Sequence, residues 1–296
     1  MITRRQFVVG LGGAATATLG LGGYAAAFEP RFRLVVTDWD LPTLRWPHAE
    51  PLKIVIVTDI HACRPWMTPE RIRFIVEKAN TLGGDIIVVL GDFVSGIGER
   101  VPNGRVEAAE WGPALSGLRA PLGVHAILGN HDWWSDLEGV KAALSQAEIP
   151  VYQNRAVKIE GATPFWLAGT DSMVAYPLGR GRFRGADDLP KTLAQITDDA
   201  PAVLMAHEPD LFVQVPDRFA VTLSGHTHGG QVRLPFLGRP VVPSAYGQRF
   251  VYGHIREEGR DLIVSAGLGC SIMPVRFGVP PELTVVTLRR AETAAI

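Results

Sequence analysis

Residues 52–61, which read LKIVIVTDIH, decide the fold of this chain. The run Leu52–Val57 is short, apolar and rich in β-branched residues, which is typical of a strand buried on both faces. Asp59 and His61 follow directly after it. In sheets of alternating strands and helices, ligands bind outside the carboxyl ends of the strands. The stretch therefore predicts an α/β fold with a polar site at one edge of a sheet.

The same arrangement recurs further along the chain. Four more apolar runs are predicted to be strands, at residues 85–90, 124–128, 202–206 and 220–223. A polar cluster follows each run, so clusters that are distant in sequence can meet at the carboxyl ends of the strands. The five clusters are Asp59-Ile60-His61, Gly91-Asp92, Gly129-Asn130-His131-Asp132, His207 and Gly225-His226-Thr227-His228.

Glycine stands before a polar residue in three of these clusters, at Gly91, Gly129 and Gly225. A residue without Cβ lets the backbone turn sharply and approach an ion closely. Carboxylates, imidazoles and amide oxygens are ligands that divalent transition ions accept. The clusters therefore predict a two-metal site, and with it an enzyme.

The order of the motifs resembles that of the calcineurin-like metallophosphoesterases. That family carries Asp-X-His, Gly-Asp, Gly-Asn-His-Asp/Glu, a lone His and Gly-His-X-His, and all five motifs occur here in this order. The resemblance extends from Pro51 to the end of the chain. It implies a four-layer α/β/β/α sandwich, in which two mixed β-sheets are flanked by helices.

The resemblance also implies a role for each site residue. Two divalent ions, Mn, Fe, Zn or Co, would lower the pKa of a water between them and orient it for in-line attack on phosphorus. His131 would stabilise the transition state or protonate the leaving oxygen. The metal ligands would be Asp59, His61 and His228 for the first ion, Asn130, His207 and His226 for the second, and Asp92 between the two.

Each of these residues has a structural alternative when it is taken alone. Asp59 and Asp92 could cap a helix or turn, and a single histidine such as His207 is often structural. Asp132 is expected to orient a histidine by hydrogen bonding. The histidines outside the motifs, His48, His125 and His254, are expected to be structural.

The first residues predict export. Thr-Arg-Arg-Gln-Phe at residues 3–7 resembles a bacterial twin-arginine signal, and residues 7–27 carry no charge. We expect residues 1–27 to be recognised by the twin-arginine export machinery and cleaved near Ala27, or retained as a membrane anchor. The protein would then lie in the periplasm or cell envelope. Residues 28–50 are expected to be a lead-in, and residues 51–296 the metallophosphoesterase domain.

Charge and cysteine content limit the partners of this chain. The formal net charge is −1, which gives no broad basic field for nucleic acid, so no nucleic acid partner is expected. The two cysteines, Cys63 and Cys270, are too few for a disulfide framework. A single bridge and two free buried thiols both remain open.

The remaining pattern supports alternating strands and helices. Thr68 and Pro69 are typical of a helix start, and apolar residues then repeat at helical spacing until Gly83. Further helices are predicted at residues 107–118, 136–147 and 187–196. A hairpin is predicted from residues 250–256 and 261–265, and a closing strand at residues 283–288.

The substrate is less determined. Arg182, in the basic stretch 180–184, and Arg276 are candidate contacts for a substrate phosphate, although the stretch could equally be a solvated loop. The apolar segment 234–238 could hold an acyl chain, touch a membrane surface or pack in the core.

Three functions follow from the sequence. The motifs resemble an exported or membrane-associated bacterial phosphodiesterase branch, which favours a phosphodiesterase acting on a small or lipid-linked phosphate ester. A phosphomonoesterase or pyrophosphatase of the UDP-diacylglucosamine type is the alternative. A metal-stabilised binding scaffold without turnover is the alternative outside enzymes.

Overall fold

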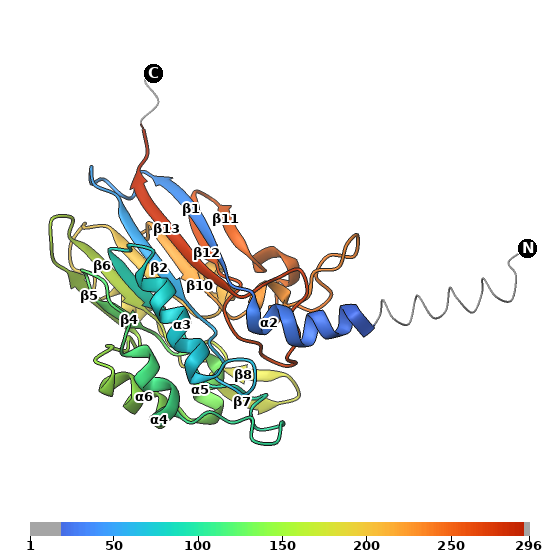
Figure 1. Cartoon of the computed structure of the whole chain (residues 1–296). Coiled ribbons are helices and arrows are strands. Elements are labelled where there is room, and N and C mark those ends of the chain that lie inside the picture. Colours follow the sequence, from blue (N-terminus) through green and yellow to red (C-terminus); the bar gives the residue numbers. More distant parts are fainter. Residues whose placement is uncertain (1–18, 293–296) are drawn as a thin grey trace, which may run out of the picture.

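The computed structural model describes residues 19–292, and these residues build two large β-sheets that lie against each other (Figure 1). The first sheet has the strand order β1-β13-β2-β3-β4. It is mixed, because β2, β3 and β4 run parallel while β13 runs antiparallel to β2 and parallel to β1. Its strands are β1 (Val35–Thr43), β2 (Leu52–Val57), β3 (Ile86–Val89), β4 (Val124–Ala126) and β13 (Glu282–Arg290).

The second sheet has the order β11-β12-β10-β9-β6-β5. Its four central strands run parallel to their neighbours, and an antiparallel strand closes each edge. The strands are β5 (Arg155–Ile159), β6 (Phe165–Gly169), β9 (Ala202–Met205), β10 (Val221–Ser224), β11 (Gly253–Glu257) and β12 (Arg260–Val264).

Helices cover the outer faces of the two sheets, and three separate apolar cores show the layering. One core joins the first sheet to its helices, one lies between the sheets and contains Trp46 and Phe165, and one joins the second sheet to short helical segments. The predicted four-layer α/β/β/α sandwich is confirmed. The covering helices are α3 (Pro69–Asn80), α4 (Ala108–Leu115) and α6 (Leu137–Gln146) on one side, and α7 (Leu189–Leu193) and η2 (Pro209–Gln214) on the other.

Helix α3 begins and ends where the sequence predicts. The Thr68 side chain accepts a hydrogen bond from the Arg71 backbone N–H, Pro69 occupies the first helical position, and the helix ends at Asn80, shortly before Gly83. Its buried side chains include Ile72, Ile75 and Val76. They face the first sheet because apolar residues three and four apart share one side of a helix.

Residues 180–184, expected as a basic substrate contact or a solvated loop, instead belong to an exposed hairpin. Strands β7 (Tyr176–Gly179) and β8 (Arg182–Arg184) pair with each other and with neither large sheet. The ring of Phe183 stacks on Trp134 at 5.6 Å between centroids. Trp134 belongs to the short helix α5 (Asn130–Ser135), so this aromatic contact holds the hairpin beside α5.

The chain before Pro51 contributes to the first sheet. Strand β1 pairs along its whole length with β13, from Val35 opposite Glu282 to Thr43 opposite Arg290. The predicted lead-in of residues 28–50 therefore includes an edge strand. The periodicity of the sequence did not reveal this strand, because its residues alternate irregularly between polar and apolar.

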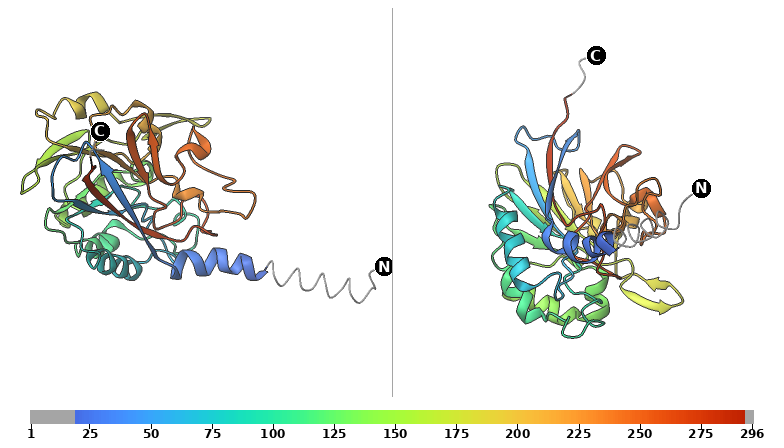
Figure 2. Two further views of the ribbon diagram at one scale, coloured as in Figure 1. Left: turned by 90° about the horizontal axis from the view of Figure 1, so that it is seen from above. Right: turned by 45° about the vertical axis from the view of Figure 1, so that its right-hand side comes forward.

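A helical segment at residues 19–32 precedes β1 and extends from the body in both Figure 1 and Figure 2. Its inner end, formed by η1 (Tyr24–Phe28) and α2 (Glu29–Phe32), is docked by three hydrogen bonds. Arg276 N donates to Ala25 O, Trp66 Nε1 donates to Ala26 O, and Val279 N donates to Glu29 Oε1. The first two thirds of the predicted export signal, residues 1–18, lie outside the described residues. Within residues 19–292, no helix combines the length and the apolarity needed to cross a bilayer.

Candidate metal centre

The five polar clusters meet where β2, β3, β4, β9 and β10 end. Each cluster begins one to three residues after its strand. Six of the seven expected metal ligands are buried, and His226 is half-buried. Three groups of side chains offer ligand atoms that lie within 4.8 Å of one another. They are Asp59, His61 and His228; His61, Asp92 and His131; and Asp92, His207 and His226.

The backbone at this edge of the fold is unusual. Five of the seven expected ligands have a positive φ: Asp59 at 53°, His61 at 45°, Asp92 at 55°, His226 at 68° and His228 at 53°. Left-handed backbone is uncommon for residues other than glycine and costs about 1–3 kcal/mol where it is strained. Such residues concentrate at functional sites, so this clustering marks the strand ends as a site.

Two glycines of the motifs make room for the ligands, as the sequence predicts. A Cβ on Gly129 would lie 2.3 Å from Asp92 Oδ1, and a Cβ on Gly225 would lie 2.4 Å from Asp59 Oδ2. No side chain fits at such distances. Glycine is therefore required at both positions for the carboxylates to reach the site.

The first ligand group forms around Asp59. His228 Nε2 lies 3.5 Å from Asp59 Oδ1 and 3.1 Å from His61 Nε2. The imidazole rings of His61 and His228 stack at 4.9 Å. The ligand atoms thus converge on one point, as in a group that holds a single ion.

The second ligand group contains an amide oxygen. His226 Nδ1 lies 2.8 Å from Asn130 Oδ1, and the rings of His207 and His226 are 5.2 Å apart. Asp92 stands between the two groups, because its Oδ2 lies 3.3 Å from His61 Nε2 and 3.3 Å from His207 Nε2. One carboxylate can therefore contact an ion in either group.

Backbone carbonyls orient His61 and His207 toward Asp92. The Nδ1 atoms of His61 and His207 donate to Val94 O at 2.9 Å and Leu90 O at 2.6 Å. Since a carbonyl only accepts, both Nδ1 atoms carry the proton and leave Nε2 available as a ligand. His207 Nε2 is buried and has no hydrogen-bond partner among the described residues. An unpartnered buried nitrogen aimed at a carboxylate fits a metal ligand.

The electrostatics favour neutral imidazoles. Burial lowers the pKa of His61 to about 3 and of His226 to about 4, and it lowers the pKa of His228 well below the ordinary value. Unprotonated rings keep the lone pairs that bind metal. His207 differs, because Asp92 and other carboxylates outweigh the effect of burial and raise its pKa. The pKa of Asp92 is in turn held well below the ordinary value, since three histidines outweigh its burial.

His131 and Asp92 both line a pocket of about 350 Å³, which we call the metal pocket. The His131 backbone N–H donates to Asp92 Oδ1 at 2.8 Å, and His131 Nε2 lies 3.1 Å from Ser271 Oγ. The pocket is also lined by Glu99, Arg100 and Trp134. The sequence did not predict Arg100 or Ser271, because neither stands in a motif; only the fold brings them to His131.

Arg276 is buried and does not line the pocket beside His131, which argues against the substrate contact that the sequence predicts. It is fully buried, and its guanidinium donates to the carbonyl oxygens of Gly269, Val279 and Ala266. Its Nη2 lies 3.2 Å from His228 Nδ1. Arg276 therefore supports the loop behind a ligand histidine. Arg182, the other candidate, lies on exposed β8 and is not among the described residues that line the pocket.

The two cysteines are both buried and free. Of the two alternatives left open by the sequence, the structure has the free thiols. Burial raises the pKa of Cys63 to about 11. A thiol with so high a pKa is not a nucleophile at neutral pH.

Comparison with known proteins agrees with this geometry. Residues 52–230 match the model of the calcineurin-like phosphoesterase family. The metallophosphoesterase YkuE of Bacillus subtilis is 31% identical over 297 residues, which cover 97% of this chain and 98% of YkuE.

Two further relatives are covered by this chain to different extents. A transmembrane protein with a metallophosphoesterase domain from Danio rerio is 30% identical over 97% of this chain and 63% of its own length. The UDP-2,3-diacylglucosamine pyrophosphatase LpxG of Chlamydia trachomatis is 28% identical over 89% of this chain and 91% of its own length.

Proposed function

Because the chain belongs to the calcineurin-like phosphoesterase family, and is thus a metal-dependent phosphoric ester hydrolase, we propose that it is a two-metal phosphodiesterase. The ligand groups on either side of Asp92 support a pair of ions. Residues Asp59, His61 and His228 would hold one ion, Asn130, His207 and His226 the other, and Asp92 would contact both. Two such ions activate water and neutralise charge on the phosphate oxygens.

One observation carries the preference for diesters. Among the described residues that line the metal pocket, Arg100 is the single Lys or Arg, and Glu99 stands beside it. A phosphomonoester is a dianion and needs cationic contacts beyond the metals, whereas a diester carries one negative charge. With Arg276 buried behind His228, the pocket suits the diester.

The residues of the pocket then have defined tasks. The oxygen of water attacks phosphorus, the bond from phosphorus to the leaving oxygen breaks, and the leaving oxygen takes up a proton. His131 stands on the pocket wall with Nε2 against Ser271 Oγ and can deliver that proton. Arg100 can donate to a non-bridging phosphate oxygen.

Hydrolysis of bis-p-nitrophenyl phosphate beside p-nitrophenyl phosphate tests this proposal. The full chain is stripped of metal and supplied in turn with Mn²⁺, Zn²⁺, Fe²⁺ or Co²⁺. Faster metal-dependent release from the diester is expected. Faster release from the monoester would overturn the preference, and undiminished release in His131→Ala would remove His131 from the mechanism.

A pyrophosphatase is the second candidate. The relative named as a UDP-2,3-diacylglucosamine pyrophosphatase aligns with nearly this whole chain, which supports it. Each phosphorus of a pyrophosphate diester carries one ester bond, one anhydride bond and a single negative charge, so its charge matches that of a phosphodiester. Release of UMP from a UDP-sugar, measured beside the nitrophenyl diester, separates the two candidates.

We also propose export by the twin-arginine route, supported by residues 3–7, with the periplasm or cell envelope as destination. A double replacement, Arg4→Lys with Arg5→Lys, should leave the protein in the cytoplasm. Unchanged fractionation of the variant would contradict this proposal.

A further inference from the structure

A second cavity of about 310 Å³ adjoins the metal pocket. Pro243, Ser271 and Ile272 line both spaces, so the two share a wall. Ser271 is also the residue whose Oγ contacts His131 Nε2 at 3.1 Å. A molecule whose phosphate lies near His131 therefore has its substituents at the edge of this second cavity.

The walls of the second cavity are apolar. Among the described residues, the apolar ones that line it are Val232, Val241, Ile272, Met273, Val275 and two prolines, and none of the lining residues is Asp, Glu, Lys or Arg. A ligand in this cavity meets hydrocarbon on nearly every side.

The few polar groups of the wall already have partners. The Gln231 amide donates to Met273 O and Val275 O and accepts from Ser271 N. Thr227 Oγ1 donates to Val251 O. His228 belongs to the first ligand group. Because these groups are committed, the cavity selects a ligand that needs no hydrogen bonds.

Apolar surface continues outside the cavity. Val241, Ile272 and Met273 are each more than 60% exposed. The chain leaves the wall after Val232 and forms a loop closed by hydrogen bonds between Leu234 and Gly238.

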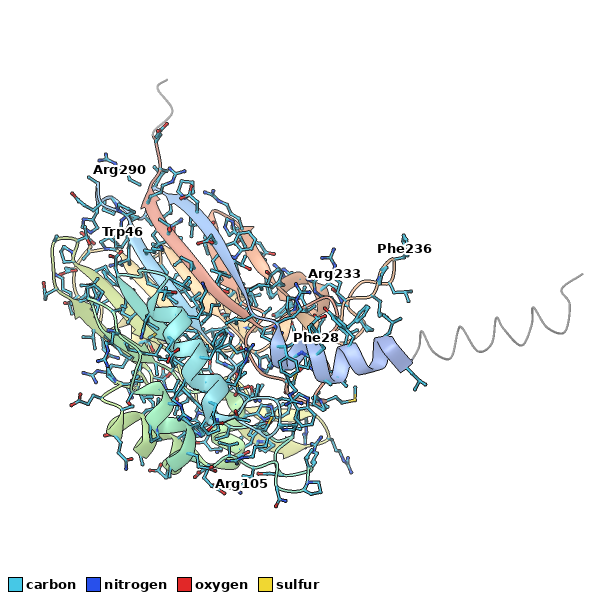
Figure 3. All side chains as sticks on the ribbon, viewed as in Figure 1. Phe28, Trp46, Arg105, Arg233, Phe236 and Arg290 are labelled. Carbon is cyan, nitrogen blue, oxygen red and sulfur yellow. The ribbon has the colours of Figure 1, made fainter. Side chains whose placement is uncertain are left out.

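Phe236 stands at the tip of that loop, fully exposed and with a φ of 65°. Figure 3 shows it projecting from the body on the same side as the N-terminal helix. Large apolar side chains gathered around an opening are a feature of binding surfaces.

We propose that the second cavity binds the alkyl chain of an amphiphilic phosphodiester whose phosphate lies at the metal pair. This inference rests on the proposed phosphodiesterase function. The shared wall at Ser271 and Ile272 lets one molecule occupy both spaces. The exposed rim around Val241 and Met273 then covers the part of a long chain that extends beyond the cavity.

The test uses a series of alkyl p-nitrophenyl phosphates with methyl, butyl and octyl groups, each below its critical micelle concentration. Hydrolysis releases p-nitrophenol from all of them, so only the chain differs. We expect kcat/KM of the full chain to rise with chain length by up to roughly fourfold per buried methylene. Val241→Asp should remove this rise and leave hydrolysis of the methyl ester unchanged.

Leu44→Asp is the matched control, because Leu44 is 72% exposed and does not line either space. It should behave as the unmodified protein. If the methyl ester is hydrolysed and longer chains give no gain, the inference is overturned while the proposed function stands.

Binding is also measured without turnover, with the apolar fluorophore N-phenyl-1-naphthylamine on metal-stripped protein. Binding that octanol displaces, and that Val241→Asp weakens at least tenfold, supports the cavity even if no ester is hydrolysed. Such binding without hydrolysis of any ester would overturn the proposed function and leave the cavity as a binding site for apolar chains. Equal binding to both proteins would overturn the inference.

Discussion

Asp132 holds the backbone of Asp92, because its Oδ2 accepts a hydrogen bond from the Asp92 N–H at 2.9 Å. The same carboxylate accepts from Gly129 N at 2.9 Å and from Phe93 N at 2.8 Å. It therefore joins the turn after β3 to the turn after β4. The sequence predicts that Asp132 orients a histidine; in the structure it instead orients the backbone of Asp92.

Asp132→Asn should weaken metal binding. An amide places an NH₂ group among backbone N–H donors, so at least one buried donor loses its acceptor and Asp92 shifts. We expect affinity to fall about 10- to 100-fold, the usual effect of changing a group that orients a ligand. Calorimetric titration of metal-stripped protein with Zn²⁺ or Mn²⁺ measures this change.

Asp188→Asn is the control for this prediction. Asp188 accepts from Lys191 N at the start of α7, away from the ligand groups. Its replacement should lower stability slightly and leave metal affinity unchanged. Equal loss of affinity in both variants would mean that Asp132 acts through general stability.

His131→Ala should separate chemistry from metal binding. His131 lines the pocket, and the family resemblance does not include it among the ligands. We expect kcat to fall by about 10²–10⁴ while metal content stays the same. Loss of an ion would instead assign His131 to the group with His61 and Asp92.

Ser271 should act through His131. Ser271→Ala removes the Oγ contact with Nε2 but keeps the backbone N–H that donates to Gln231. We expect kcat to fall several-fold and the pH profile of kcat to shift. Ser271→Thr should restore both, and no shift in the profile would remove Ser271 from the positioning of His131.

Arg276 and Arg100 should give opposite phenotypes. Arg276→Met leaves buried carbonyls without donors, so the free energy of unfolding should fall by about 3 kcal/mol or more. Arg100 lies on the surface of the metal pocket, so Arg100→Ala should leave thermal stability unchanged and lower kcat/KM for the diester roughly tenfold. A stable Arg276→Met with a raised KM would return Arg276 to the substrate site.

The sequence predicted which polar side chains meet at the strand ends better than it predicted the wall of the pocket, for a physical reason. Residues such as Asp59 and His207 stand directly after strands, and parallel strands bring their carboxyl ends together whatever their separation in sequence. Arg276 and Arg100 stand on loops, where residue type does not show whether a guanidinium faces a carbonyl or the solvent. The contact between Arg276 and His228 can be seen only in the folded loop.

The strands also differ in how well the sequence predicts them, because central strands are buried and edge strands are partly exposed. Buried runs such as Leu52–Val57 carry a continuous apolar signal, and the prediction placed this strand with the bounds that the structure has. Edge strand β1 is largely half-exposed, with Asp38 and Asp40 between apolar residues, and the sequence did not reveal it. Its stability comes from pairing with β13, a contact that spans most of the chain.

Metal removal should lower the melting temperature. Buried Asp59, Asp92 and Asp132 crowd negative charge at the site, and an ion that binds only the folded state stabilises it by mass action, about 2.7 kcal/mol at a hundredfold excess over Kd. Calorimetry before and after treatment with a chelator measures this. Equal melting temperatures would mean that the ligand groups hold no ion.

This stabilisation should grow with pH. Burial and the nearby Asp92 raise the pKa of Asp132 to about 7, and carboxylates outweigh burial to raise that of His207. A raised folded pKa gives stability below the unfolded pKa that is lost as pH rises through the folded pKa. Metal-free protein should therefore lose stability between about pH 4 and 7 through Asp132, and above about pH 6.5 through His207. Metal affinity rises as His207 loses its proton, so the gain in melting temperature should be larger at about pH 8 than at about pH 6.

The N-terminal helical segment should contribute to stability through Glu29. Glu29 is buried, and its Oε1 accepts from Val279 N, close to the Arg276 that contacts His228. Glu29→Ala leaves that N–H buried without an acceptor and should lower the free energy of unfolding by about 1–3 kcal/mol. Glu29→Gln keeps an acceptor and should recover most of the loss. If both variants melt like the unmodified protein, the segment is not held by this contact.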